Sequence, residues 1–125
     1  RPLVDTSVWV AHVRATERNM VKLLETDRVL IHPIIIGELA CGNLRNRVEI
    51  LENLGQLPSS VAADQGEVLE LIEACHLCGR GIGWIDAHLL ASTLITGCRL
   101  WTLDRALGRV ALELGVGWPQ PKGGM

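Results

Sequence analysis

The sequence contains no phenylalanine and no tyrosine, and it has only four tryptophans. A folded core must therefore consist mainly of Leu, Ile, Val and Ala side chains. Long apolar runs are missing too, since none approaches the roughly 18 residues that a membrane-spanning helix needs. No signal peptide is recognisable, so we expect a cytoplasmic protein that is not attached to a membrane.

Lysine is also scarce, because the sequence has ten arginines but only Lys22 and Lys122. The formal net charge of −2 argues against a protein that binds nucleic acid nonspecifically through a basic surface. It leaves open the sign of any single groove. Arginine suits a phosphate-binding groove, because its planar guanidinium group can hold two phosphate oxygens at once.

Cysteine and histidine form no pattern of a known catalytic or metal site. The four cysteines are Cys41, Cys75, Cys78 and Cys98. A structural zinc site commonly needs two paired motifs, and only one CxxC is present. We therefore expect the cysteines to be small apolar side chains within apolar segments. The histidines are predicted to be structural or to face solvent: His12, His32, His76 and His88.

The chain is long enough for one domain with its own core, since it has 125 residues. Short apolar stretches that favour strands lie at 3–4, 29–31, 99–103 and 116–118. Helices are predicted at about 6–13, 17–26, 33–41, 45–54, 84–96 and 104–114, with a further helix opening at Asp64. This alternation predicts an α/β domain over residues 1–118, with a short, mainly parallel sheet flanked by helices, and a loose tail at 119–125.

Two aspartates share one local context. Asp5 and Asp104 each follow a short apolar strand and precede a helix. Parallel sheets place ligand sites at the carboxyl ends of their strands, which would bring both carboxylates to one edge. Aspartate is also a favoured N-cap of helices, and for either residue alone the cap is the commoner role. Both interpretations stay open.

Two further acids lie in apolar helices. Glu38 is the only charged residue of PIIIGELAC, and a buried carboxylate is costly unless it lines a cleft or meets a cation. It could instead face water on a narrow polar stripe or pair with an arginine. Asp86 lies in the first turn of WIDAHLLASTLI, where the helix dipole alone would favour a carboxylate.

The acids mean more as a group than singly. Four carboxylates at one site, Asp5, Glu38, Asp86 and Asp104, would repel one another without a cation. Oxygen ligands suit Mg²⁺ or Mn²⁺, and such ions activate water and neutralise charge on a phosphate. The residues alone therefore indicate a metal-dependent hydrolase of a phosphate ester.

Four segments resemble the motifs of PIN-domain ribonucleases, in order and over essentially the whole chain. They are VDTSVW, IIIGELACG, GIGWIDAHLLAS and LWTLD, with HPIIIGELACGNLRNR as a further match. The resemblance is strongest to the VapC branch, the toxins of type II toxin–antitoxin pairs. It implies a PIN-like fold and a Mg²⁺- or Mn²⁺-dependent endoribonuclease. Asp5 and Asp86 would be direct metal ligands, and Glu38 and Asp104 would complete the shell and position the attacking water.

The resemblance also implies partners and supporting residues. RNA would be the substrate, an antitoxin tail would cover the acidic groove, and the toxin would form a homodimer. Thr6 and Ser7, together with Thr102, match small polar residues near the site that orient the acids, and we include the first two as candidate substrate contacts.

Two arginines are candidate contacts for substrate phosphates. Arg45 and Arg47 lie in GNLRNR, directly after the helix that carries Glu38. An acidic groove needs such cations to accept RNA. The competing interpretation is that both only form surface ion pairs with Glu49 or Glu52, and we weigh the two equally.

Two other classes of protein remain as alternatives. The first is a PIN-like module that binds RNA or protein without cleaving RNA, against which the complete acidic set argues. The second is a small-molecule phosphatase or nucleotidase of another α/β fold. Such enzymes often have a second aspartate two residues after a nucleophilic one, and Asp5 is followed by Thr, Ser and Val.

Overall fold

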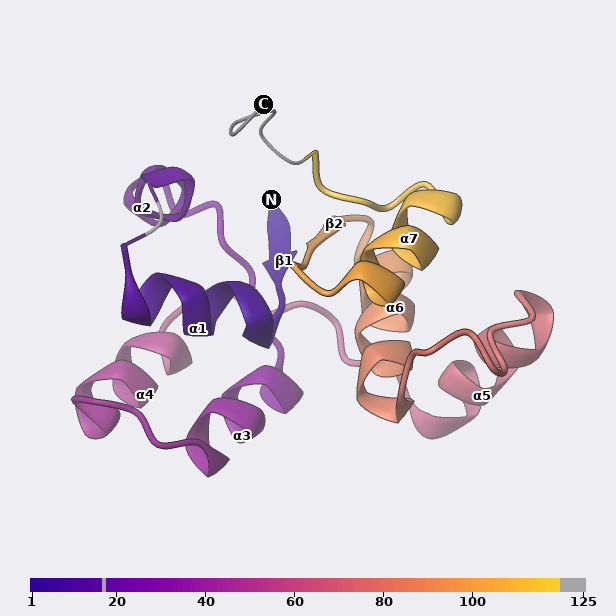
Figure 1. Ribbon diagram of the computed structural model, residues 1–125, viewed down its shortest axis with the longest axis horizontal. Helices are drawn as coiled ribbons and strands as arrows, with labels where there is room; N and C mark the ends of the chain where they lie inside the picture. Colours follow the sequence, from indigo (N-terminus) through magenta and orange to yellow (C-terminus); the bar gives the residue numbers. More distant parts are fainter. Residues whose placement is uncertain (17, 120–125) are drawn as a thin grey trace.

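The computed structural model describes residues 1–16 and 18–119 and contains two strands and seven helices within these ranges (Figure 1). In chain order they are β1 (Pro2–Val4), α1 (Thr6–Arg14), α2 (Arg18–Glu25), α3 (Pro33–Cys41), α4 (Arg47–Gly55), α5 (Gln65–Ala74), α6 (Trp84–Thr96), β2 (Arg99–Trp101) and α7 (Arg105–Glu113). The predicted α/β class is confirmed. Except for Pro119, the predicted loose tail lies outside the described residues.

A short parallel sheet runs through the middle of the fold. β1 and β2 pair in parallel, with Val4 opposite Trp101. Isolated parallel bridges extend it on both sides: Leu3–Leu30, Ile31–Ser59 and Leu100–Gly117. The predicted strands at 29–31 and 116–118 are therefore present only as single bridges. All of β1 is buried, as expected for a parallel strand covered on both faces.

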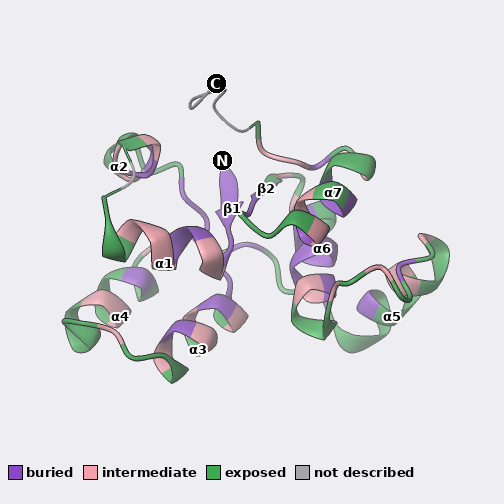
Figure 2. Cartoon of the chain, in the orientation of Figure 1, coloured by how far each residue is buried: buried purple, intermediate pink, exposed green. Residues whose placement is uncertain are grey.

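Helices cover the sheet from both sides. In Figure 1, α1, α3 and α4 lie on one side of the strands, α6 and α7 lie on the other, and α5 is outermost. Figure 2 shows the buried residues gathered along the strands and the inner faces of these helices. The largest fully buried side chains are mostly aliphatic, including Leu3, Ile35, Leu89, Leu100 and Leu107. This agrees with a core that lacks Phe and Tyr.

Local capping signals set several helix ends. Asp64 and Glu67 form the predicted capping box at α5, with N–H···O distances of 2.8 and 3.0 Å. His32 is buried and caps α3, because its Nδ1 accepts the Ile34 N–H at 3.0 Å while its Nε2 lies 3.0 Å from the Ser92 hydroxyl. Burial, and then the charge of His88, lowers the pKa of His32, and this favours the neutral ring that acceptance of the Ile34 N–H by Nδ1 requires. His32 is thus structural, as predicted.

Some element boundaries differ from the sequence prediction. β2 ends at Trp101 rather than at residue 103, because the N–H groups of Leu103 and Asp104 donate to side-chain hydroxyls instead of continuing the sheet. α4 begins at Arg47 rather than at residue 45, because Asn46 adopts a left-handed backbone conformation with φ of 52°.

The cysteines are free thiols. Cys75 and Cys98 pack against the core, as expected of small apolar side chains. The same expectation is wrong for Cys41 and Cys78, which are exposed at the end of α3 and in the loop after α5. Among the described residues, no helix is long and apolar enough to cross a membrane.

Candidate active site

Asp5 lies at the carboxyl end of β1, next to the end of β2. The Asp5 N–H donates to the carbonyl of Trp101 at 2.9 Å, which continues the pairing of the two strands. The residue is 7% exposed. It occupies the N-cap position of α1, yet its side chain makes no capping hydrogen bond. The capping interpretation therefore does not account for Asp5.

Two hydroxyl groups hold the Asp5 carboxylate. Its Oδ2 accepts hydrogen bonds from Ser7 Oγ at 2.8 Å and from Thr102 Oγ1 at 2.7 Å. Ser7 Oγ also accepts the Leu103 N–H at 2.9 Å, which fixes the hydroxyl between the two strand ends. Hydrogen bonds to a charged group are strong and offset part of the cost of burying it. The carboxylate is therefore held in one orientation.

Asp104 follows the other strand and has a different role. Its Oδ1 accepts the Leu107 N–H at 2.9 Å and so caps α7. The residue is exposed. Its own N–H donates to Thr102 Oγ1 at 3.0 Å, so a single hydroxyl group contacts both Asp5 and Asp104. The capping interpretation applies to Asp104 without removing it from the neighbourhood of Asp5.

Asp86 is half-buried in the first turn of α6, and its pKa responds to the charges of Asp5 and Asp104. Its Oδ2 accepts the Gly83 N–H at 3.0 Å. Burial raises the pKa of Asp86 above its usual value of 3.8, and the charges of Asp5 and Asp104 raise it further, whereas the Gly83 hydrogen bond opposes the shift. The charges of Asp5 and Asp104 thus influence the titration of Asp86.

Glu38 lies half-buried on α3 and accepts the Thr6 hydroxyl at 2.7 Å. Since Thr6 follows Asp5 directly, this bond ties Glu38 to the same strand end. Within the described part of the chain, Glu38 has no ion pair with an arginine. It lines a cavity of about 530 Å³ whose wall also includes Thr6, Arg14 and Arg45.

The two predicted arginines have different surroundings. Arg47 donates from Nη2 and Nε to the Ala40 carbonyl at 2.9 and 3.3 Å, so it holds the end of α3. Arg45 is exposed on the wall of the Glu38 cavity. Neither pairs with Glu49 or Glu52, since Arg80–Glu113 is the only ion pair found among the described residues.

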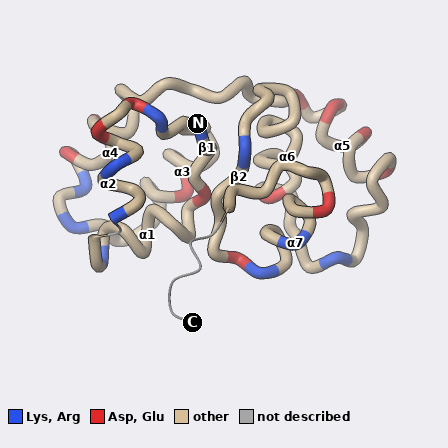
Figure 3. The backbone as a smooth tube through the Cα atoms, turned by 90° about the horizontal axis from the view of Figure 1, so that it is seen from above, with Lys and Arg blue, Asp and Glu red and all other residues tan. Residues whose placement is uncertain are grey.

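The prediction missed Arg14, which shares the cavity with Arg45. Arg14 lies four residues after Val10, which also lines the cavity, so the two share one face of α1, and this spacing was an available signal. Figure 3 shows basic positions around α1, α2 and α4, with acidic positions among them, whereas the coloured positions along α5 are acidic. The Glu38 cavity therefore lies in the more basic half of the molecule.

The four acids do not form a compact cluster. Over residues 1–16 and 18–119, no group of three Asp, Glu, His or Cys side chains is close enough to hold a metal ion as it stands. Thr102 links Asp5 to Asp104 by hydrogen bonds, and the charges of these two residues raise the pKa of Asp86, after its burial. Glu38 is linked through Thr6. A shared metal site stays a prediction, although its oxygen donors are of the right chemical kind.

Comparison with known proteins agrees with this architecture. The family model of the PIN domain matches residues 3–113, and the chain belongs to this family. Two curated relatives are each called Ribonuclease VapC32, from Mycobacterium tuberculosis strains CDC 1551 / Oshkosh and ATCC 25618 / H37Rv. Each is 44% identical to this chain over 115 residues, which cover 91% of the chain and 93% of the relative. The resemblance to VapC-type PIN ribonucleases is confirmed.

Proposed function

We propose that the protein is a metal-dependent endoribonuclease, the VapC-type toxin of a type II toxin–antitoxin pair, acting on RNA in the cytoplasm. One observation carries the proposal. The Asp5 carboxylate is buried at the meeting point of two parallel strands and is held there by Ser7 and Thr102. A charge kept in such a position without a capping role suits the binding of a cation. The 44% identity to proteins called ribonucleases supports RNA as the substrate class.

The proposed metal is Mg²⁺ or Mn²⁺. Asp5 and Asp86 would hold it, with Glu38 and Asp104 completing the shell directly or through water. The raised pKa of Asp86 fits this assignment, because a cation would relieve the repulsion that Asp5 and Asp104 exert on it. A bound ion would lower the pKa of a water molecule and neutralise charge on the phosphate. Ser7 and Thr102 keep Asp5 oriented, and Thr6 does the same for Glu38.

Arg45 is the first candidate for a contact with the RNA phosphates. It shares a cavity with Glu38 and has no carboxylate partner within the described residues, whereas Arg47 donates two hydrogen bonds to the Ala40 carbonyl. Arg14 joins Arg45 in this proposal. Thr6 and Ser7 already have acidic partners, which favours an orienting role over direct contact with substrate.

Arg45→Gln should weaken the binding of single-stranded RNA and flatten the slope of log K against log salt by roughly 0.7, the loss of one phosphate contact. Arg28→Gln is the control, because Arg28 is exposed in the loop after α2. Equal affinity and slope for the Arg45 variant and the wild type would remove Arg45 from the substrate site.

Further parts of the proposal follow from the VapC relationship. An antitoxin protein would cover the acidic groove with its tail, and two copies of the toxin would form a homodimer. The alternative is a PIN-like module that binds RNA or protein without cutting. One observation favours this alternative, namely that the acids of the described residues do not form a ready metal cluster.

A cleavage assay separates the two functions. The purified chain is incubated with a mixed RNA pool in Mg²⁺ or Mn²⁺, with EDTA in a parallel reaction, and the new RNA ends are sequenced. We expect cleavage that needs metal and that Asp5→Asn abolishes. Glu70→Gln is the control, because Glu70 is an exposed acid on α5. RNA binding without cleavage in either metal would favour the non-catalytic module.

A further inference from the structure

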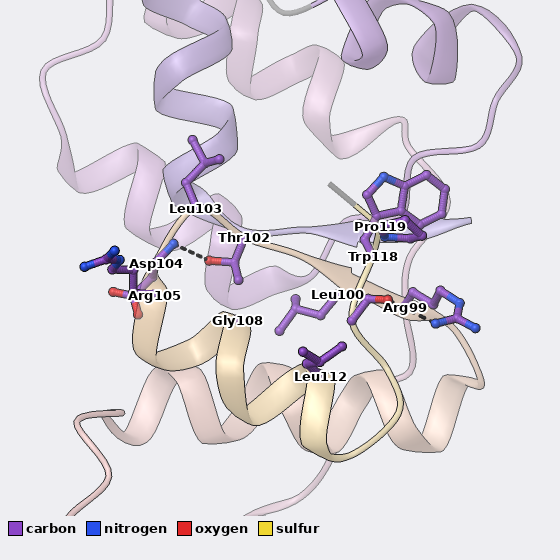
Figure 4. A pocket seen from close by; sticks show the side chains of 11 residues that line it. Arg99, Leu100, Thr102, Leu103, Asp104, Arg105, Gly108, Leu112, Trp118 and Pro119 are labelled. Carbon is purple, nitrogen blue, oxygen red and sulfur yellow. Dashed lines mark hydrogen bonds between the residues drawn. The ribbon is translucent and has the colours of Figure 1, made fainter. Parts of the chain in front are cut away.

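A second cavity opens beside Thr102 and Asp104. It has a volume of about 600 Å³ and is formed by β2, α7 and the segment 117–119 (Figure 4). This volume lies within the range of small-molecule sites, roughly 300–1,000 Å³. None of the roles described so far uses the cavity as a whole.

The cavity is continuous with the candidate active site. Thr102 and Asp104 both line it, and Thr102 Oγ1 contacts Asp5 and Asp104. Figure 4 shows Asp104 and Arg105 at one end of the lining, and Arg99 and Trp118 at the other. A chain molecule bound at the acids can therefore extend into the cavity.

An aromatic ring forms the end of the cavity away from the acids. The Trp118 N–H donates to the Leu100 carbonyl at 2.9 Å, which fixes the backbone of this segment against β2. The Trp118 indole lies near that of Trp101, with ring centroids 6.5 Å apart and planes inclined by 32°. Leu112 adds an apolar wall, and its side chain is 74% exposed to solvent.

Positive charge is present at both ends of the cavity. Arg105 and Arg99 are exposed, and neither has a carboxylate partner among the described residues. Arg99 donates to the Gly117 carbonyl at 3.0 Å, which places its guanidinium group beside Trp118. Asp104 is the only acid in the lining, and one of its oxygens already caps α7.

We propose that this cavity binds one nucleotide of single-stranded RNA next to the phosphate that is cleaved, and this inference rests on the proposed function. The base would stack on Trp118 and contact Leu112, while Arg105 and Arg99 would contact the phosphates on its two sides. Sites for single-stranded nucleic acid combine an aromatic platform with flanking cations. The apolar wall, the indole and the two arginines supply this combination within reach of Asp5.

The test measures RNA affinity without cleavage. A fluorescein-labelled single-stranded RNA of mixed sequence is titrated in EDTA, and fluorescence anisotropy gives Kd. Trp118→Ala should weaken binding about tenfold, the loss of one base–aromatic stack. Trp118→Phe keeps an aromatic plane and should stay within about threefold of the wild type. Arg105→Gln and Arg99→Gln should each flatten the salt slope by roughly 0.7.

A second variant is needed because Trp118 also packs near Trp101, so Trp118→Ala could disturb the fold. Leu112→Glu alters an exposed side chain and places a negative charge in the cavity, so it should weaken RNA binding about tenfold. Leu69→Glu is the matched control, because Leu69 is 48% exposed on α5, outside the cavity, and it should bind RNA like the wild type. Thermal melts establish that each variant folds.

The outcomes distinguish this inference from the proposed function. Wild-type RNA affinity of folded Leu112→Glu, or of folded Trp118→Ala, overturns the nucleotide site even if the wild type cleaves RNA. Unchanged RNA affinity with lost recovery of a co-expressed partner protein would mean that the cavity binds protein, and the inference is again wrong. Failure of the wild type to cleave RNA in Mg²⁺ or Mn²⁺ would overturn the proposed function and, with it, the placement of the nucleotide beside a cleaved phosphate. The affinity measurements need no metal, so they would still show whether the cavity binds a nucleotide.

Discussion

The junctions β1–α1 and β2–α7 share one local plan, in which a buried strand is followed by an aspartate and a helix. Asp5 is buried, binds two hydroxyl groups and caps nothing. Asp104 is exposed and caps its helix. The same sequence pattern therefore gives one carboxylate that is held by two hydroxyl groups and another that caps a helix.

The cause of this difference is tertiary. Asp5 comes directly after its strand, and the neighbouring strand brings Thr102 within 2.7 Å of its carboxylate. Asp104 comes three residues after the end of β2, where the chain has left the sheet and Leu103 is exposed. The role of an aspartate after a strand thus depends on which side chains the neighbouring strand places beside its carboxylate.

Of the substitutions considered, Asp5→Asn should have the largest effect on RNA cleavage. It tests whether the Asp5 carboxylate, unlike that of Asp104, has a chemical role and no structural one. The amide keeps the shape and can still accept both hydroxyl bonds, but it loses the charge that would hold a cation. We expect RNA cleavage to fall by about a hundredfold or more while the protein stays folded. Initial rates at saturating Mn²⁺ and a circular dichroism melt measure the two effects. A variant that cleaves at the wild-type rate would exclude Asp5 from the site.

Features with local signals could be predicted from the sequence. Pro33 opens α3 and Asp64 opens α5, because a proline in the first turn and a capping box depend only on near neighbours. The four acids were found by the same means, since each stands out against an apolar strand or helix.

Features that depend on distant partners could not be predicted in this way. The early end of β2 requires hydroxyls from Ser7 and Thr102. The contact of Arg47 with the Ala40 carbonyl joins residues seven positions apart, and a left-handed residue, Asn46, lies between them. The position of Trp118 depends on pairing between its segment and Leu100. The pattern of apolar residues along the sequence does not predict this pairing.

Two substitutions of Asp104 separate its cap from its charge. Asp104→Ala removes the acceptor of the Leu107 N–H and should lower the free energy of unfolding by about 1 kcal/mol. Asp104→Asn keeps a good N-cap and should lose only a few tenths of that. If the charge also serves the metal, both variants should cleave RNA more slowly, and by similar factors. Urea unfolding and cleavage rates provide the two measurements, and equal instability of the variants would contradict the capping role.

Asp86→Asn tests whether the charges of Asp5 and Asp104 both raise the pKa of Asp86. Its effect on stability should depend on pH. The pKa of Asp86 is raised in the folded protein, so the native state binds a proton more readily than the unfolded chain. The stability that this proton gives is present below the usual pKa of 3.8 and is lost as pH rises through the raised value. In EDTA, Asp86→Asn should therefore melt higher than the wild type at pH 7, and the difference should shrink toward acid pH. A difference that is constant with pH would exclude the shift.

Glu113→Gln should have the smallest effect and provides the reference for Asp104→Ala, since both residues lie at the ends of α7. Glu113 and Arg80 form a two-point ion pair at 2.6 and 3.1 Å, and the arginine lowers the pKa of the Glu113 carboxyl. A lowered pKa gives stability above the usual range that is lost as pH falls through the shifted value. However, the side chains are 31% and 49% exposed, and water and salt screen such pairs. We expect the melting temperature in 0.15 M salt to match the wild type within error, and 1 M salt to remove any residual difference. If Glu113→Gln lost as much stability as Asp104→Ala, the two ends of α7 would contribute equally to stability. The helix cap would then be no more important than an exposed ion pair.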